Sequence, residues 1–246
     1  MASLRKKWRA WDELCRPVLE GGIGLRNLLE AQRSLHMKFV WNLFQGKSVW
    51  SKFLVAKYVG NNHISCVDSS KGSKSWKMLL DNMAAVKKFS KWRVKECNIS
   101  FWQDRWLNDG PLSEQHEVWD FSNLSIAECK LGNGWNVELF DRLVGMEKLE
   151  QILEELGRVK QGKDTLIWLP NAHGNFSPHS AWECIRSRGP KVPSHKWLWH
   201  PALPKKMSLI MWKTHNNCLP VDDRVRRAGI SLVSKCDCCD NGGYED

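Results

Sequence analysis

Apolar side chains recur every three or four residues through much of this chain, a spacing typical of helices that bury one face. The clearest case follows the glycine-rich segment 21–24, where two adjacent files of mostly apolar residues run along residues 27–45. The first file is Leu28, Leu35, Phe39 and Leu43, and the second is Leu29, His36, Val40 and Phe44. The pattern predicts a helix that ends at Gly46 and points Phe39 into a core.

Further helices are expected from the same spacing and from capping residues. The segment 74–89 carries apolar residues on one face, among them Leu80, which we expect to point inward. Ser177 followed by Pro178 is a typical N-cap and first-turn pair for another helix. The complete set of expected helices is 27–45, 48–58, 74–89, 122–129, 137–156, 178–188, 205–216 and 220–228.

Two short stretches favour β-structure. Residues 99–102 alternate in polarity and predict a short strand. Residues 165–169 and 175–177 flank a segment rich in Pro, Asn and Gly, and this arrangement predicts a β-hairpin. The sequence therefore predicts a mostly α fold with small antiparallel β elements, of the α+β class.

Positive charge is concentrated in the first part of the chain. The 246 residues include 37 Lys and Arg against 27 Asp and Glu, and residues 1–100 alone hold 19 basic and 7 acidic side chains. A polyanion such as RNA or DNA is the natural partner of such a stretch, because its binding releases counterions. A solvated lysine-rich surface is the alternative explanation, and charge alone does not decide between the two.

The sequence carries no apolar run of roughly 18 residues and no N-terminal secretory pattern. We therefore expect neither a membrane partner nor a secreted protein, and an intracellular location, with the nucleus as one option. Nine cysteines occur, of which Cys15, Cys66, Cys97, Cys129, Cys184 and Cys218 are scattered singly. For an intracellular chain this distribution favours reduced thiols over a disulfide framework.

Tryptophan is unusually frequent, with 15 Trp against 2 Tyr. Most of these residues sit in apolar company, as Trp76 does on its helical face, and core packing is the default interpretation because a Trp buries so much apolar area. The best candidates for nucleic-acid contact are Lys91, Trp92, Arg93 and Lys95, where an aromatic ring lies among cations and could stack on a base.

Several chemistries are disfavoured. The adjacent acids Asp222 and Asp223 follow Pro220 and fit the first turn of a helix better than a two-metal site. The glycines at 21–24 lack the Gly-Lys-Ser/Thr ending of a phosphate-binding loop and fit a turn. No residue stands in a recognisable nucleophile context, so we expect no enzyme activity and no small-molecule substrate.

The last cysteines form a cluster with metal-ligand spacing. Cys236 and Cys239 are separated by two residues, as in one half of a tetrahedral zinc site, and Cys238 is a spare thiol between them. His215 and Cys218 could complete the shell, since Cys218 precedes Cys236 by 18 positions. The alternative is that Cys218 is simply buried near the end of a helix. We therefore expect zinc to be bound weakly or partially.

Four segments carry a resemblance to a known family. They are WDELCRPVLEGGIGLRNL (11–28), ISFWQDRW (99–106), DTLIWLPNAHGNFSPHSAW (164–182), and the run of matches from Trp197-Leu198-Trp199 through Leu219-Pro220 to Cys236-Asp237-Cys238-Cys239. In this order they resemble the region that follows the reverse transcriptase core in plant LINE-type non-LTR retrotransposon proteins. The resemblance extends across nearly the whole chain.

The resemblance implies two parts. Residues 1–160 correspond to a helical connector downstream of the polymerase core, and residues 164–246 to a reverse transcriptase zinc-binding domain that lacks the last ligands of the family pattern. The polymerase and ribonuclease H domains of relatives would lie outside these residues. The expected function is that of a non-catalytic, nucleic-acid-associated remnant with a partial zinc site. A helical protein-interaction module, or a pseudogene product without function, is the alternative.

Overall fold

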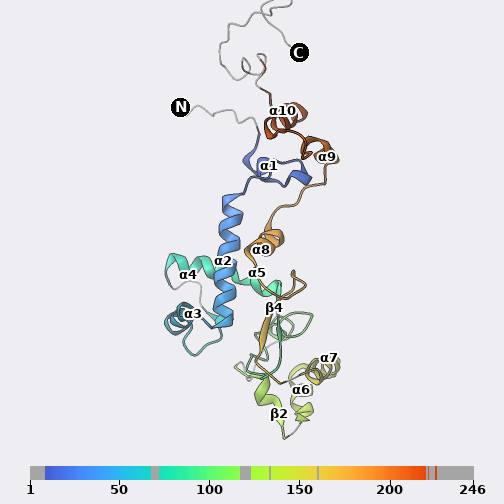
Figure 1. Cartoon of the computed structure of the whole chain (residues 1–246). Coiled ribbons are helices and arrows are strands. Elements are labelled where there is room, and N and C mark those ends of the chain that lie inside the picture. Colours follow the sequence, from blue (N-terminus) through green and yellow to red (C-terminus); the bar gives the residue numbers. More distant parts are fainter. Residues whose placement is uncertain are drawn as a thin grey trace, which may run out of the picture. The chain divides into compact units, whose positions relative to one another are not determined.

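A computed structural model describes residues 9–67, 72–116, 123–132, 134–159 and 161–219, together with Val221 and Val225. The longer helices in these ranges are α1 (Trp11–Cys15), α2 (Leu28–Gln45), α3 (Val49–Leu54), α4 (Lys74–Asp81), α5 (Met83–Lys88), α6 (Val137–Val144), α7 (Met146–Gly157), α8 (Pro178–Ile185), α9 (His195–Leu198) and α10 (Lys205–His215) (Figure 1). Short helices are η1 (Val18–Glu20), η2 (Val55–Val59), η3 (Ile64–Cys66), η4 (Leu112–Glu114) and η5 (Ile126–Cys129).

The β-structure within the described ranges consists of two small antiparallel sheets. In one, β1 (Ser90–Arg93) pairs with β4 (Thr165–Trp168), and in the other, β2 (Lys130–Leu131) pairs with β3 (Gly134–Trp135). The predicted α+β class is therefore confirmed. No helix of the described ranges is long and apolar enough to cross a bilayer.

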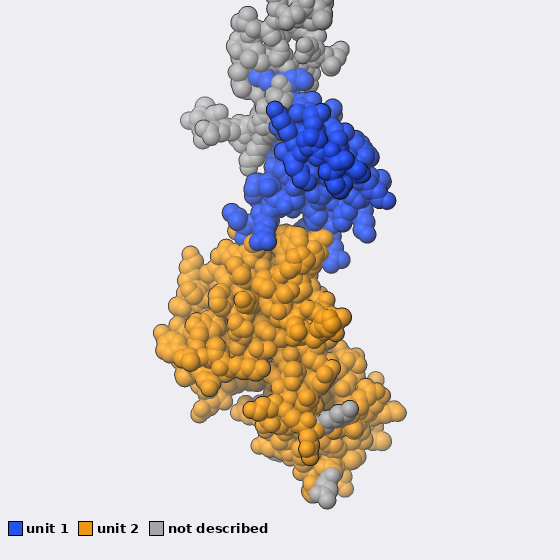
Figure 2. All heavy atoms as spheres, in the orientation of Figure 1, with its two compact units in different colours: residues 1–28, 187–246 blue, residues 29–186 orange. Residues whose placement is uncertain are grey.

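The chain divides into two compact units (Figure 2). Unit 1 combines residues 1–28 with 187–246, and unit 2 is residues 29–186. The start of the chain thus packs with the segment that follows residue 186. The division into a connector at 1–160 and a zinc-binding part at 164–246 stays a prediction.

Unit 1 is organised around the turn at residues 21–24. A Cβ on Gly22 would lie 2.0 Å from the carbonyl oxygen of Arg16, so no larger residue fits there. The carbonyl oxygen of Gly21 accepts the indole N–H of the buried Trp212 at 2.8 Å, and Glu20 accepts the backbone N–H of Gly189 at 2.8 Å. The glycines therefore form a packed turn, as the sequence indicated.

Helix α2 has the predicted bounds but a different buried face. Met37, Val40, Trp41 and Leu43 are its buried apolar residues, whereas Phe39 is 46% exposed. The expectation that Phe39 points inward was wrong; its ring lies against Trp50, with 5.4 Å between the ring centroids. Leu28, Leu29 and Leu35 also belonged to the predicted apolar files, and the structure leaves all three exposed. The buried face takes Leu43 and Val40, one from each predicted file, together with Met37 and Trp41 from neither. The physical reason is that contacts with distant partners such as Trp168, and not the spacing alone, select which apolar side chains are buried.

The other helices follow the sequence with local breaks. The predicted helix 74–89 is split at Asn82, whose side-chain amide donates to the carbonyl of Met78, and Leu80 is half-buried against the core. The predicted helix 137–156 is split at Gly145, which has a φ of 76°. Helix α8 begins as predicted, with the Ser177 hydroxyl accepting the backbone N–H of Ser180. The expected helix at 220–228 lies almost entirely outside the described residues.

Three predicted elements differ in kind. Instead of a strand at 99–102, the structure has one isolated bridge between Ser100 and Ser125 followed by a turn. The expected helix at 122–129 is reduced to the short η5, held by a capping box between Ser125 and Glu128. The predicted hairpin was also wrong. Residues 165–168 pair with β1 and not with 175–177, and the chain turns back so that Trp168 N–H donates to the carbonyl of Gly174.

Two hydrophobic clusters fill unit 2. The first cluster gathers around Phe101, Trp102, Trp106 and Phe140 and takes in α6 and α7. The second gathers around Trp41, Trp76 and Trp168 and takes in α2, α4, α5 and α8. Trp92 of β1 packs against both clusters, so the β1–β4 sheet lies where they meet. The expectation that most tryptophans belong to the core is confirmed for these large buried residues.

Phe140 and Phe39 provide a matched pair of substitutions, because one is fully buried and the other is 46% exposed. We expect Phe140→Ala to lower the free energy of unfolding by about 3–5 kcal/mol, typical of a buried Phe. Phe39→Ala should cost about 1 kcal/mol or less. Urea titration of both variants measures the difference, and equal losses would contradict the assigned face of α2.

Candidate nucleic-acid interface and candidate zinc ligands

The strand β1 contains three of the four predicted nucleic-acid residues. Its antiparallel register pairs Ser90 with Trp168 and Trp92 with Leu166. Successive side chains of a strand point to opposite faces. Trp92 therefore faces the core with Leu166 and Trp168, and Lys91 and Arg93 lie on the opposite face of the sheet.

Lys91 is held by acceptors within unit 2. Its ammonium lies 2.7 Å from Glu155 Oε1 on α7 and 2.8 Å from Asn108 Oδ1. Its side chain is only 17% exposed and that of Glu155 21%, so the pair is largely withdrawn from water. This cation ties β1 to α7 and has little freedom to meet a phosphate.

Trp92 is half-buried and contacts both hydrophobic clusters of unit 2. Its backbone N–H donates to the carbonyl of Arg105 at 2.7 Å, which fixes the strand to the segment 99–106. This placement favours the packing interpretation of Trp92 over base stacking. Arg93, in contrast, is exposed, and no carboxylate among the described residues forms an ion pair with it.

A carboxylate that the sequence analysis did not single out orders the turn after β1. Asp164 Oδ1 accepts the backbone N–H groups of Lys95 at 2.6 Å and Cys97 at 3.2 Å, and Oδ2 accepts that of Asn98 at 2.8 Å. Cys97 has a φ of 69°, a left-handed conformation that few non-glycine residues adopt. Three charge-assisted hydrogen bonds offset that strain. Lys95, the fourth predicted contact, belongs to this turn and is half-buried.

The segment ISFWQDRW closes on itself around a second carboxylate. Asp104 is 8% exposed, accepts the backbone N–H of Ser100 at 2.9 Å and lies 3.4 Å from His63 Nε2. The indole of Trp106 donates to the carbonyl of Phe101 at 2.9 Å. The segment is therefore a compact packing element, since its aromatic side chains are buried and its carboxylate supports the turn.

Two buried cysteines of unit 2 have little nucleophilic or metal-binding character. Burial raises the pKa of the Cys129 thiol to about 12, with a smaller contribution from the neighbouring Glu128 charge. Burial also raises the pKa of Cys97, and the charge of Asp164 acts in the same direction. Because the thiolate is the metal ligand and the nucleophile, both residues serve the core.

His215 and Cys218 were expected as supplementary zinc ligands. His215, the last residue of α10, is exposed and its ring packs edge-on against Trp197 at 6.2 Å. Cys218 is 5% exposed, and its Sγ lies 3.2 Å from the carbonyl oxygen of Asn216. Within the described ranges no three His, Cys, Asp or Glu side chains are grouped so that they could hold a metal ion. The described residues therefore do not by themselves fit a zinc site.

The other expected ligands, Cys236, Cys238 and Cys239, fall outside the described residues. Asp222 and Asp223, which were expected at the start of a helix and not in a metal site, fall outside them too. The structure thus brings none of the five predicted ligands into a described metal site. The sequence could not reveal that Asp164 anchors the turn after β1. Its only signal was a single acid placed before a predicted strand, and such an acid can have many roles.

Comparisons with known proteins now add to this geometry. Residues 176–246 match a family model described as zinc-binding in reverse transcriptase. The chain is also similar to a putative ribonuclease H protein of Arabidopsis thaliana, at 27% identity over 250 residues. No solved structure matches the chain.

The alignment with the Arabidopsis protein covers 96% of this chain and 40% of the relative. The chain therefore spans less than half the length of that relative. Together the two similarities support a protein related to retrotransposon reverse transcriptases, with a region of zinc-binding type in its last third.

Replacing Asp164 by Asn tests the anchoring of the turn after β1. The amide keeps the shape of the side chain but loses the negative charge and one of the two accepting oxygens. We expect the free energy of unfolding to fall by about 1–3 kcal/mol, typical of hydrogen bonds to a charged group. Asp81→Asn on the exposed end of α4 is the matched control. Equal urea midpoints for the two variants would contradict the anchoring role.

Proposed function

We propose that this chain is a non-catalytic part of a LINE-type retrotransposon reverse transcriptase protein and associates with nucleic acid. The observation that carries the proposal is the match of residues 176–246 to the zinc-binding family of reverse transcriptases. The similarity to the Arabidopsis protein, which covers 96% of the chain, extends this relation to the helical part. The ordered resemblance of the segments 11–28, 99–106 and 164–182 to plant LINE proteins supports the finer assignment.

Charge supports nucleic acid as the partner. Exposed cations lie along unit 2, among them Lys38 on α2, Lys47 shortly after α2 and Arg93 on β1. Acidic residues are scarce in the same part of the sequence, with 7 among residues 1–100. A surface of this kind attracts a phosphate backbone without reading its sequence.

The proposal assigns no catalytic step to this chain. Polymerases and ribonucleases H act through clustered carboxylates that hold divalent metal ions. In the described ranges the two most constrained carboxylates, Asp104 and Asp164, accept backbone N–H groups and support turns. We accordingly propose a binding role and expect no Mg²⁺-dependent primer extension.

A protein-interaction module is the second candidate function, favoured by one observation. Phe39, Val49, Trp50 and Phe53 are all exposed on α2 and α3, with fractions from 40% for Trp50 to 86% for Val49. Grouped apolar side chains on a surface are characteristic of protein interfaces. If the chain does not bind nucleic acid in the following test, the protein-interaction module becomes the favoured function.

Filter binding of a structured RNA over a range of salt concentrations tests the proposed function. A polyanion bound through Lys and Arg gives a logarithm of affinity that falls linearly with the logarithm of salt concentration. We expect such a slope, corresponding to several neutralised phosphates. A duplicate titration with a neutral polysaccharide serves as the control. Affinity that is absent, or that does not change with salt, would refute the proposal.

Zinc is the second part of the proposal. We propose that Cys236 and Cys239 supply thiolates to a weak site, with Cys238 beside them and no obligatory contribution from His215 or Cys218. Metal analysis of the purified chain should return less than one zinc per chain, most of it lost on dialysis, because no described group completes the shell. Cys236→Ser should remove it, whereas Cys66→Ser, at an exposed single thiol, should not. One tightly bound zinc that disappears on replacing His215 would contradict this assignment.

A further inference from the structure

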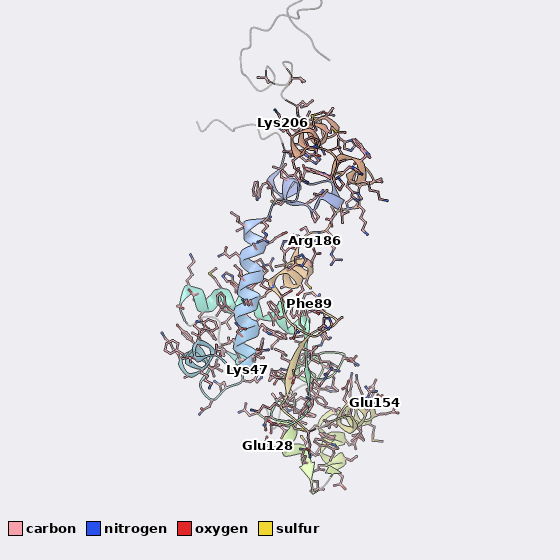
Figure 3. The ribbon with its side chains drawn as sticks, in the orientation of Figure 1. Lys47, Phe89, Glu128, Glu154, Arg186 and Lys206 are labelled. Atoms are coloured by element: carbon pink, nitrogen blue, oxygen red, sulfur yellow. The ribbon has the colours of Figure 1, made fainter. Side chains whose placement is uncertain are left out.

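A groove of about 740 Å³ lies beside strand β4 in unit 2. Three separate segments line it: the end of α2 with Lys47, the strand residues Arg93 and Thr165, and the turn at residues 169–176. Figure 3 labels Lys47, which lies two residues after the end of α2. Arg93 was among the nucleic-acid contacts predicted from the sequence, whereas the other two segments were not connected with it.

The charge of this groove has one sign. Lys47 and Arg93 are exposed, and no described carboxylate pairs with either of them. None of the groove's lining residues, all of which the structure describes, is acidic, and His173 adds an imidazole. Asp164 adjoins Thr165 in sequence, yet both of its oxygens accept backbone N–H groups of residues 95–98. The groove is therefore positive, in contrast to Lys91, whose charge is balanced by Glu155.

A second groove of unit 2 provides the comparison. It has a volume of about 500 Å³ and is lined by Lys87, Lys88 and Arg105, but also by Asp109 and Glu114. Its mixed charge makes it the poorer surface for a polyanion.

The floor of the positive groove is apolar and aromatic. Ile167 and the 47% exposed Leu169 contribute to it, together with Phe176 and Trp41, which is 6% exposed. Phe176 is stacked on Trp41, with ring centroids 5.4 Å apart and an interplanar angle of 22°. A ring fixed in this way can support a nucleobase at little entropic cost, and stacking on aromatic side chains is the usual way in which single strands are held.

The walls offer hydrogen-bonding groups and are fixed by the local chain. Thr165, Gln45, Asn171 and Asn175 present hydroxyl and amide groups of the kind that bond to base edges. Asn171 Oδ1 accepts the backbone N–H of His173 at 2.9 Å, which closes the turn.

Gly174 fixes the wall at a second point. A Cβ there would lie 2.8 Å from Ile167 Cγ2, and its φ is 72°. Only glycine allows the turn to cross the strand this closely. The groove is thus formed by the fold itself before any ligand binds.

We infer that this groove binds a single strand of nucleic acid, with Lys47 and Arg93 on its phosphates and the Ile167–Phe176 floor beneath its bases. The inference rests on the proposed function and assigns a site to it. A single strand is favoured over a duplex because only unpaired bases expose the faces that an apolar floor can contact. RNA and DNA share this chemistry, and the test separates them.

The double variant Lys47→Ala/Arg93→Ala of the full chain tests the groove. Its matched control is Arg33→Ala/Lys77→Ala, which removes one Arg and one Lys from exposed positions on α2 and α4. Arg33 lies 12 residues before Gln45, or about 18 Å along the helix at 1.5 Å per residue. The probes are fluorescent oligouridine and oligodeoxythymidine strands of 12 nucleotides and a duplex of the same length, each titrated at several salt concentrations by fluorescence anisotropy.

The groove variant should bind both single strands about tenfold or more weakly at 0.1 M salt, and its salt slope should fall by about 1.4, or roughly 0.7 for each lost phosphate contact. The control should retain most of the wild-type affinity, and the wild type should prefer the single strands to the duplex. A difference between oligouridine and oligodeoxythymidine identifies the preferred strand. Lys47→Glu alone gives the same test if the double variant does not fold by circular dichroism.

Each contrary outcome has a distinct meaning. Salt-dependent binding by the wild type that falls equally in the groove and control variants would overturn the groove and leave the proposed function standing. Absence of binding by the wild type would overturn both. Equal affinity of the wild type for duplex and single strands would overturn the assignment of single strands to this groove.

Discussion

The pairing of β1 with β4 is the interaction on which the architecture of unit 2 depends. It joins Ser90–Arg93 to Thr165–Trp168 across more than seventy residues of intervening chain, which is costly in conformational entropy. Burial of Leu166 and Trp168 and the half-burial of Trp92 offset that cost. Because Trp92 contacts both hydrophobic clusters, the sheet also connects them.

Two polar contacts fix the position of this sheet. Lys91 bonds to Glu155 on α7, and Asp164 accepts three backbone N–H groups in the turn that follows β1. Both contacts lie at the ends of the paired strands and link them to sequence-distant elements. The same pairing sets Arg93 beside Thr165, and both residues line the positive groove.

The sequence predicted those features that depend on neighbouring residues. The bounds of α2, the Ser177 cap of α8 and the packed glycine turn all follow from local rules, and the structure has them. The buried face of α2 could not be predicted in the same way. Phe39 and Val40 are both apolar and adjacent on the helix, and the burial of Val40 rather than Phe39 is decided by distant partners such as Trp168. The hairpin failed for the same reason, since β1 is a better partner for β4 than the residues that follow it.

The candidate site shows the same division. Lys91, Trp92 and Arg93 were grouped by their composition, yet the strand turns them to different faces and gives each a different environment. The groove draws on residues near positions 47, 93 and 173, which no linear pattern connects. For zinc, the spacing of Cys236 and Cys239 remains the main signal, because the described His215 and Cys218 form no metal group.

Photo-crosslinking tests most directly the claim that the groove beside strand β4 meets nucleic acid. A 4-thiouridine strand is irradiated with the full chain, and the attached peptides are identified by mass spectrometry. The account predicts that crosslinks concentrate in residues 165–176 and around Arg93, where bases would lie on the groove floor. Crosslinks confined to other parts of the chain, with none in these segments, would contradict it.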